Sequence, residues 1–192
     1  VIIPASLIDI GSNKITSYVF EGCTSLSDII VKNGNTKYDS RENCNAVIET
    51  ATNMLVAGCK STIIPNSVTR IYSYAFYNCT GLTSITIPSS VQNIASTAFK
   101  DCSNLESIVV EDGNTKYDCR QNCNAVIESA TNKLVFGCKN TIIPNSVTEI
   151  GNYAFYGCSG LTSIIFPEKV TTIGKEAFSY CTGLTSVIIP NS

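Results

Sequence analysis

Ten cysteines are the residues of this 192-residue chain with the widest chemical range, because a thiol can serve as nucleophile, metal ligand or half of a disulfide. A nucleophile needs a base beside it, and the chain has no histidine, the commonest base and metal ligand. Cys119 and Cys123 lack the second ligand pair of a zinc site. Asp112, Gly113 and Asn114 lack the carboxylate pattern of a calcium loop and indicate a turn. We therefore expect no enzyme, no metal and no cofactor.

The composition narrows the classes of partner. Hydrophobic residues make up 44% of the chain, which is enough for a core, while charged residues make up 15% and the net charge is -2. Because no basic run is present, we expect no binding to nucleic acid. No apolar stretch approaches the roughly 18 residues of a membrane span, so we also expect no direct membrane insertion.

Two internal repeats organise the chain. The shorter period is the spacing between Pro65 and Pro88. The longer period relates residues 33–69 to residues 112–148, and these two segments are almost identical. One supercycle of the longer period holds two regular coils and then one long coil. These three coils are residues 65–87, 88–110 and 111–143. A short period in the range of roughly 20 to 50 residues predicts a stack of similar coils.

Each coil contains one short apolar segment that alternates with polar residues and ends near a proline, a pattern typical of a strand. We expect eight strands, at residues 2–3, 29–31, 62–64, 85–87, 108–110, 142–143, 164–166 and 187–189. Because a return segment follows each strand, the strands should pair in parallel as one sheet. The return segments should hold short helical turns. The long coils should each hold a β-hairpin, at residues 46–49 with 54–57 and residues 125–128 with 133–136.

The repeat unit resembles a known family. Its pattern, A-F-x-x-C-x-x-L-x-x-I-x-I-P-x-S-V, is similar to the BspA-like, or Treponema-type, leucine-rich repeat of bacterial and protist surface proteins. The residues that carry the resemblance in two coils are Ala75, Phe76, Cys79, Leu82, Ile85, Ile87, Pro88 and Val91, and Ala154, Phe155, Cys158, Leu161, Ile164, Phe166, Pro167 and Val170.

The resemblance implies an α/β repeat architecture. This is a right-handed leucine-rich-repeat solenoid, with a parallel concave β-sheet of about eight short strands. Its convex segments are short helices or irregular, and two β-hairpins are inserted. The resemblance also implies a cell-surface or extracellular location in a bacterium or protist, with a role in adhesion or protein recognition. Two features depart from the family's pattern: the long hairpin coils, and a first coil that is longer over residues 4–20, where we expect local irregularity.

Residues 1–192 are expected to form a single leucine-rich-repeat domain, because each coil contacts only its neighbours. The chain begins and ends at the same phase of the repeat unit, without a capping segment at either end. We therefore expect an internal fragment of a longer array.

The cysteines fall into three sets. One set recurs three residues before the leucine of the repeat and should consist of free core thiols, namely Cys23, Cys79, Cys102, Cys158 and Cys181. In the hairpins, a turn midway between the two strands places Cys44 opposite Cys59 and Cys123 opposite Cys138. Each of these pairs can be a cross-strand disulfide or two core thiols, and both alternatives stay open. The tenth cysteine, Cys119, replaces a serine of the first supercycle and is expected to be a free thiol.

The candidate binding face follows from the strand pattern, because residues between inward positions should face the concave solvent. The polar column on this face consists of Asp28, Ser61, Ser84, Ser107, Asn140, Ser163 and Ser186. The neighbouring aliphatic column consists of Ile30, Ile63, Thr86, Val109, Ile142, Ile165 and Ile188. This column can reflect β propensity alone or form an extended apolar binding strip. A second candidate is the tyrosine cluster of the return segments, Tyr72, Tyr74, Tyr77, Tyr153, Tyr156 and Tyr180.

The leading functional hypothesis is a non-catalytic recognition or adhesion module, on the cell surface or secreted. It would bind a protein ligand, such as a host surface or matrix protein, through an extended curved face. The alternative is a structural spacer that holds another domain away from the cell surface. Carbohydrate binding is disfavoured, because the predicted concave face lacks an aromatic platform.

Mass spectrometry of the unreduced chain tests the hairpin cysteines. If both hairpin pairs are bridged, the mass should be about 4 Da below that of the reduced chain, because each bridge removes two hydrogens. An unchanged mass shows thiols throughout. A mass loss that involves all ten cysteines would contradict the assignment of the repeating set to the core.

Overall fold

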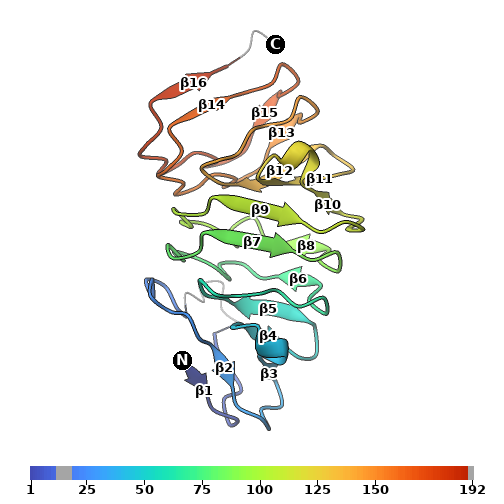
Figure 1. Ribbon diagram of the computed structural model, residues 1–192, viewed down its shortest axis with the longest axis vertical. Coiled ribbons are helices and arrows are strands. Elements are labelled where there is room, and N and C mark those ends of the chain that lie inside the picture. The colour runs from blue at the N-terminus through green and yellow to red at the C-terminus, as the bar shows by residue number, and fades with distance from the viewer. Residues whose placement is uncertain (12–18, 190–192) are drawn as a thin grey trace.

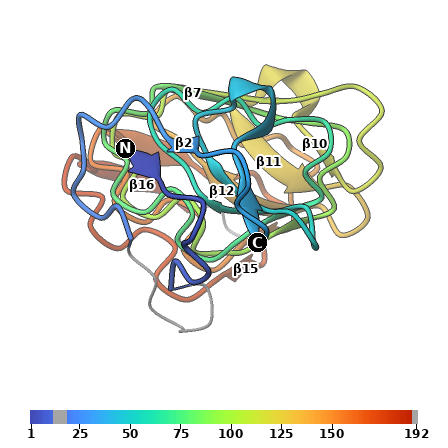
Figure 2. The same cartoon turned by 90° about the horizontal axis from the view of Figure 1, so that it is seen from below.

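The computed structural model of the protein describes residues 1–11 and 19–189, which consist of short strands and turns. The helices among these residues are two 3-10 turns, η1 (Arg41–Asn43) and η2 (Arg120–Asn122). Figure 1 shows the chain winding along the longest axis as a stack of coils. Figure 2, seen from below, shows successive coils superposed around a common interior. The irregularity expected over residues 4–20 falls partly on residues 12–18, which lie outside the described residues, as does Pro190 of the last repeat unit.

Six of the eight expected strands are present and form the repeat ladder, a set of three parallel pairs. The pairs are β1 (Ile2–Ile3) with β2 (Ile30–Val31), β7 (Ser84–Ile87) with β9 (Ser107–Val110), and β14 (Ser163–Ile165) with β16 (Ser186–Ile188). Ser84 pairs with Ser107 and Ser163 with Ser186, so the shorter period of the sequence is the register of the ladder in the regular coils.

The prediction of one continuous sheet is wrong, because residues 62–64 and 142–143 form no strand. At these two levels the neighbour in the stack is the turn that follows η1 or η2. The amide of Ile63 donates to the carbonyl of Cys44 at 3.1 Å, and the amide of Ile142 donates to that of Cys123 at 3.0 Å. At each of these levels the turn offers one backbone carbonyl as acceptor, whereas a strand would offer several. The repeat ladder is therefore interrupted twice.

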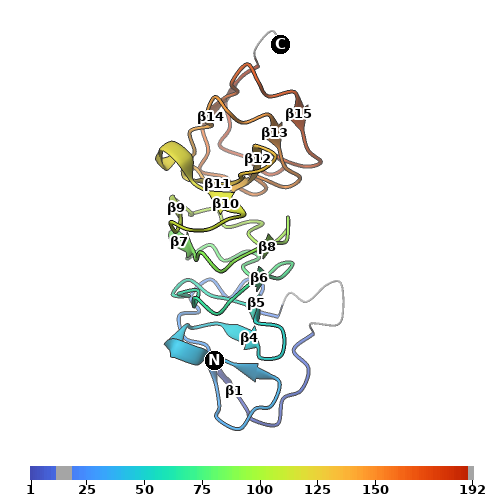
Figure 3. The ribbon, with the colours of Figure 1, turned by 90° about the vertical axis from the view of Figure 1, so that its right-hand side faces the viewer.

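The return segments form two further sheets, and the segments around their Ala-Phe pairs form hydrogen-bonded turns but no helix. The first runs in the order β3 (Tyr38–Asp39), β4 (Val47–Glu49), β5 (Met54–Ala57), β6 (Arg70–Ile71) and β8 (Asn93–Ile94). The second runs in the order β10 (Tyr117–Asp118), β11 (Ala125–Glu128), β12 (Lys133–Gly137), β13 (Glu149–Ile150) and β15 (Thr172–Ile173). We call these two sheets the return ladders; Figure 3 shows β6, β8, β13 and β15 on the opposite side of the stack from β7, β9 and β14.

Both predicted hairpins are confirmed. β4 pairs antiparallel with β5, and β11 pairs antiparallel with β12. The second strand of each hairpin then pairs in parallel with the next return strand, β6 or β13. The hairpins are therefore the first rungs of the return ladders.

The core lies between the repeat ladder and the return ladders. Its aromatic side chains stack along the axis: the rings of Phe76 and Phe99 lie 4.9 Å apart, and those of Phe99 and Phe136 lie 4.2 Å apart. Phe76 packs so closely against Gly58 that a Cβ at this glycine would collide with the ring. The contacts are those expected for offset or stacked aromatic pairs in a well-packed interior.

Most of the repeating cysteines are core residues, as expected. Cys102, Cys158 and Cys181 are buried and Cys79 is half-buried, whereas Cys23 in the first coil is exposed. Burial raises the pKa of the Cys158 thiol to about 12, so this thiol is mostly protonated at neutral pH.

Asparagine side chains clamp each long coil to the coil before it. The Nδ2 of Asn114 donates to the carbonyls of Pro88 and Val91, at 2.9 and 3.1 Å. Its Oδ1 accepts from the amides of Lys116 and Tyr117, at 2.9 and 2.8 Å. Asn35 makes the same four bonds one supercycle earlier, to Pro4, Leu7, Lys37 and Tyr38. A pattern that indicated only a turn therefore also joins two coils.

Replacement of Phe76 by alanine should lower the free energy of unfolding by roughly 3–5 kcal/mol, because the ring is 1% exposed and stacks on the next coil. Urea denaturation measures the loss. Ser84→Ala, at an exposed position of the repeat ladder, is the control and should change the value by less than about 0.5 kcal/mol. A loss below about 1 kcal/mol for Phe76→Ala would show that the ring does not support the core.

Candidate protein-binding face

The structure exposes every member of the predicted aliphatic column, which we now call the aliphatic row. Ile63 and Ile142 are each 75% exposed, and the other members are also exposed. Their neighbours in the strands, Ile85 and Ile87, are buried, so the alternation predicted from the sequence holds. Ile2 pairs with Ile30, is exposed too, and extends the row by one coil. Ile2 occupies the same position of the repeat unit as the other members of the aliphatic row. This position could have identified it from the sequence.

The predicted polar column runs beside the aliphatic row. Asp28, Ser61, Ser84, Asn140, Ser163 and Ser186 are exposed, and Ser107 is half-buried. Asp28 is the single charged member of the two columns. Charges adjacent to the columns include an ion pair in which Lys139 Nζ lies 2.6 Å from Glu106 Oε1. The face is therefore nearly neutral, with hydroxyl groups beside aliphatic groups.

A hollow opens where the repeat ladder is interrupted after η2. Its volume is about 340 Å³, and Ile142, Ile165, Asn145 and Pro167 contribute to its walls. Two members of the aliphatic row thus line a depression. Sequence periodicity could not reveal it, because it results from the loss of strand pairing at residues 142–143.

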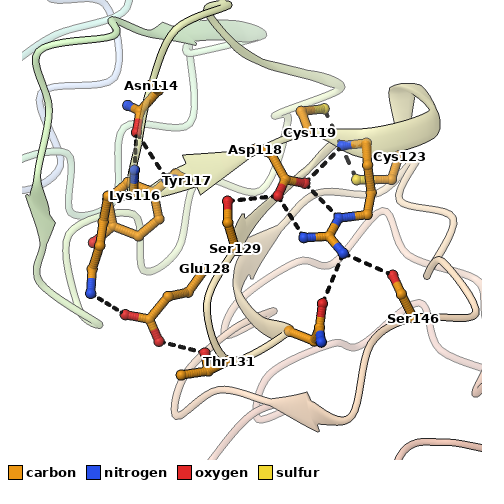
Figure 4. A network of polar contacts seen from close by, with 12 residues as sticks. Asn114, Lys116, Tyr117, Asp118, Cys119, Cys123, Glu128, Ser129, Thr131 and Ser146 are labelled. Atoms are coloured by element: carbon orange, nitrogen blue, oxygen red, sulfur yellow. Dashed lines mark hydrogen bonds and ion pairs between the residues drawn. The ribbon is translucent and has the colours of Figure 1, made fainter.

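A larger hollow, of about 730 Å³, lies between β9 and the long coil that follows it. Val109 of the aliphatic row, Glu111, Asp118, Cys119 and Arg120 are among the residues that line it. This wall is rich in polar groups that bind one another, as Figure 4 shows.

Arg120 is the centre of this polar network. Its Nε and Nη2 donate to the two carboxylate oxygens of Asp118, at 2.7 and 2.6 Å. Its Nη1 donates to Asn132 Oδ1 at 2.8 Å and to Ser146 Oγ at 3.1 Å. One guanidinium thereby joins β10, the hairpin turn and the following return segment. The first supercycle repeats the arrangement around Arg41, with Asp39, Asn53 and Ser67.

The carboxylate of Asp118 is held in its charged form. Burial acts to raise its pKa, but hydrogen bonds from Arg120 and Ser129 outweigh burial and lower the pKa below its usual value. The Ser129 hydroxyl donates to Asp118 Oδ2 at 2.7 Å. The first supercycle has Thr50 at the place of Ser129, and its hydroxyl donates to the carbonyl of Lys37 instead.

Four members of the predicted tyrosine cluster gather around Lys100, a cation that the sequence pattern did not indicate. Lys100 Nζ lies 3.6 Å from the ring centre of Tyr156 and 4.4 Å from that of Tyr153. Tyr180 packs on Tyr156 with ring centres 5.0 Å apart, and Tyr74 also lies within 6.0 Å of Lys100 Nζ. The rings therefore contact a charge of the protein itself.

The four hairpin cysteines are free thiols in the structure. Cys44 donates to the carbonyl of Ala46, and Cys59 donates to the carbonyls of Ser27 and Asn45. A register shift between Val47 and Ile48 displaces the hairpin pairing by one residue on the side of Cys44, so that Val47 pairs with Ala57. The simple pairing rule of the sequence analysis therefore does not extend to this cysteine.

The described residues form no helix that is long and apolar enough to cross a membrane. Within residues 1–11 and 19–189, no group of three or more histidine, cysteine, aspartate or glutamate side chains is arranged to hold a metal ion.

Comparison with known proteins identifies the repeat and the fold. The model of a family described as the BspA type leucine rich repeat region matches the chain in six copies, over residues 2–54, 48–134 and 126–192. No curated protein matches the chain significantly.

Two solved structures are similar to the chain over nearly its whole length. One is a leucine rich cell surface protein from Faecalibacterium prausnitzii A2-165, with 23% identity, a TM-score of 0.61, and coverage of 98% of this chain and 60% of that one. The other is the pneumococcal vaccine antigen PcpA, with 20% identity, a TM-score of 0.61, and coverage of 100% and 39%. The chain thus spans 60% or less of these proteins, and the likeness shows a shared leucine-rich-repeat fold.

Replacement of Asp118 by asparagine should lower the free energy of unfolding at neutral pH, because Arg120 loses its charged partner. The pKa of Asp118 is lower in the folded state, so its contribution is present above the unfolded pKa and disappears as pH falls through the folded pKa. The difference between wild type and variant should therefore shrink from neutral pH to about pH 2. Urea denaturation across this range measures it, with Asp112→Asn at an exposed turn as control. A difference independent of pH would contradict the assignment.

Proposed function

Because the chain belongs to the BspA-type leucine-rich repeat family, we propose that it is a non-catalytic recognition module that binds another protein. The aliphatic row is the contact surface in this proposal. The module acts at the cell surface or outside the cell, a location supported by the similar protein of Faecalibacterium prausnitzii, which is described as a cell surface protein.

The finer architecture belongs to the same proposal. The coils form a single right-handed solenoid domain over residues 1–192, and the aliphatic row lies on its concave side. The two-ladder arrangement supports this proposal, because the repeat ladder and the return ladders lie on opposite sides of the stack (Figure 3).

The observation that carries the function is the exposure of a long, regular row of β-branched side chains. Ile63, Ile142 and Ile165 each expose 65% or more of their surface. Single exposed aliphatic residues are ordinary, but a contiguous apolar strip is unfavourable in water and tends to mark an interaction surface. Within each parallel pair of the repeat ladder, the register sets neighbouring members of the row about 4.8 Å apart, as with Thr86 and Val109.

The chemistry of the face indicates the kind of partner. Aliphatic groups flanked by serine hydroxyls suit a protein surface with apolar side chains and a polar rim. The hollow at Ile142 and Ile165 can accept a side chain of that partner. The proposed ligand is a host surface or matrix protein that lies along the stack. If the protein is instead a spacer, the row has no partner.

Charge substitution on the row separates recognition from spacing. The double variant Ile63→Asp and Ile142→Asp should weaken binding to immobilised fibronectin, laminin or collagen at least about tenfold, because two carboxylates would be buried unpaired. Both side chains are 75% exposed, so the fold should be retained, and circular dichroism checks this. Biolayer interferometry measures the binding.

The matched control is Ile8→Asp, because Ile8 is 70% exposed but lies outside the row. It should bind as the wild type does. Equal loss in both variants would show an unspecific effect of charge. If the wild-type protein binds none of the three matrix proteins, the result contradicts the proposal of a matrix ligand and favours the role of a spacer.

A further inference from the structure

Cys119 and Cys123 are brought together at the two ends of η2. The Cys123 thiol points toward the Cys119 sulfur, with the two Sγ atoms 4.0 Å apart (Figure 4). The sequence analysis paired Cys123 with Cys138, whose thiol instead donates to the carbonyls of Glu106 and Asn124. The sulfur atom that contacts Cys123 is therefore that of Cys119, which was expected to be a free thiol.

The two thiols differ in access. Cys119 is half-buried and lines the hollow of about 730 Å³ beside β9. Cys123 is 1% exposed. Burial, followed by the neighbouring Cys119, raises the pKa of Cys123 to about 12. A reagent in solution can thus reach Cys119 first, while Cys123 lies behind it.

The first supercycle shows that the turn does not need a thiol at position 119. Ser40 occupies the equivalent place, with φ and ψ of -127° and 53°, against -127° and 56° for Cys119. Cys44 and Cys123 have the same backbone conformation as well. Because the backbone is unchanged, the thiol of Cys119 adds chemistry to a turn that a serine can build.

We propose that Cys119 and Cys123 are an oxidisable dithiol that forms a disulfide by exchange with a low-molecular-weight disulfide. Cys119 loses its proton, and its thiolate attacks one sulfur of the small disulfide. A mixed disulfide forms, and the first small thiolate leaves and takes up a proton. Cys123 then loses its proton and attacks the Cys119 sulfur, which releases the second small thiolate to be protonated. Two electrons and two protons pass from the protein to the small disulfide, which becomes two thiols.

To form the bond, the sulfur atoms must approach from 4.0 Å to about 2.05 Å. The bridge would link both ends of η2, next to the Arg120 network that forms one wall of the hollow. Oxidation would thereby hold this wall of the binding face in one conformation.

Peptide mapping of the full chain tests the proposal. The folded protein is treated with oxidised glutathione and then unfolded in urea, so that its remaining thiols can be alkylated before digestion with trypsin. Cleavage after Lys116, Arg120 and Lys133 places Cys119 in peptide 117–120 and Cys123 in peptide 121–133. We expect these two peptides to be recovered as one disulfide-linked species. Peptide 42–60, which carries Cys44 and Cys59, is the internal control and should be alkylated at both thiols.

Cys119→Ser is the matched variant, because it copies Ser40 of the first supercycle. It should fold as the wild type does and give no linked species. The proposal is overturned if the wild type carries glutathione on Cys119 with Cys123 alkylated, or if both thiols are alkylated. It is also overturned if peptide 121–133 is linked to peptide 134–139, which would show a bridge to Cys138.

Discussion

Parallel backbone pairing between successive coils is the constraint on which the rest of this structure depends. Its register places each residue of the regular unit beside its own copy in the next coil, as with Ile85 and Ile108. Ile85 and Ile108 are therefore both buried, and Thr86 and Val109 are both exposed. The same register stacks Phe76 on Phe99 inside and aligns Thr86 with Val109 outside. Core and candidate binding face are two results of one pairing rule.

The long coils show how the stack accommodates segments that do not follow the parallel pairing of the regular coils. Each long coil adds a hairpin, whose second strand joins a return ladder, and a 3-10 turn, which interrupts the repeat ladder. Asn35 and Asn114 compensate for the lost pairing by binding two carbonyls of the preceding coil. The hollows at the face lie where regularity is lost. The departures from the repeat thus create the hollows in the nearly neutral face, and a uniform ladder would not have them.

Much of the fold was readable from the sequence because it depends on short-range patterns. The periods identified the family, the alternation around Ile85 and Ile164 located six strands, and the hairpin boundaries were correct to within one residue. The exposure of the aliphatic row was readable for the same reason, since a strand alternates its side chains with period two wherever it lies. These properties belong to single coils and are copied by the repeat.

Tertiary structure decided which segments lie next to one another, and no local pattern contains that information. It interrupted the repeat ladder at residues 62–64, because the neighbour there is a turn. It placed Lys100 among tyrosines from other coils and brought Cys119 within 4.0 Å of Cys123. The sequence by itself determined the repeating unit and the face of each side chain. The stacking of unequal coils determined the contacts, because a register shift or a 3-10 turn changes which atoms meet without changing the repeat.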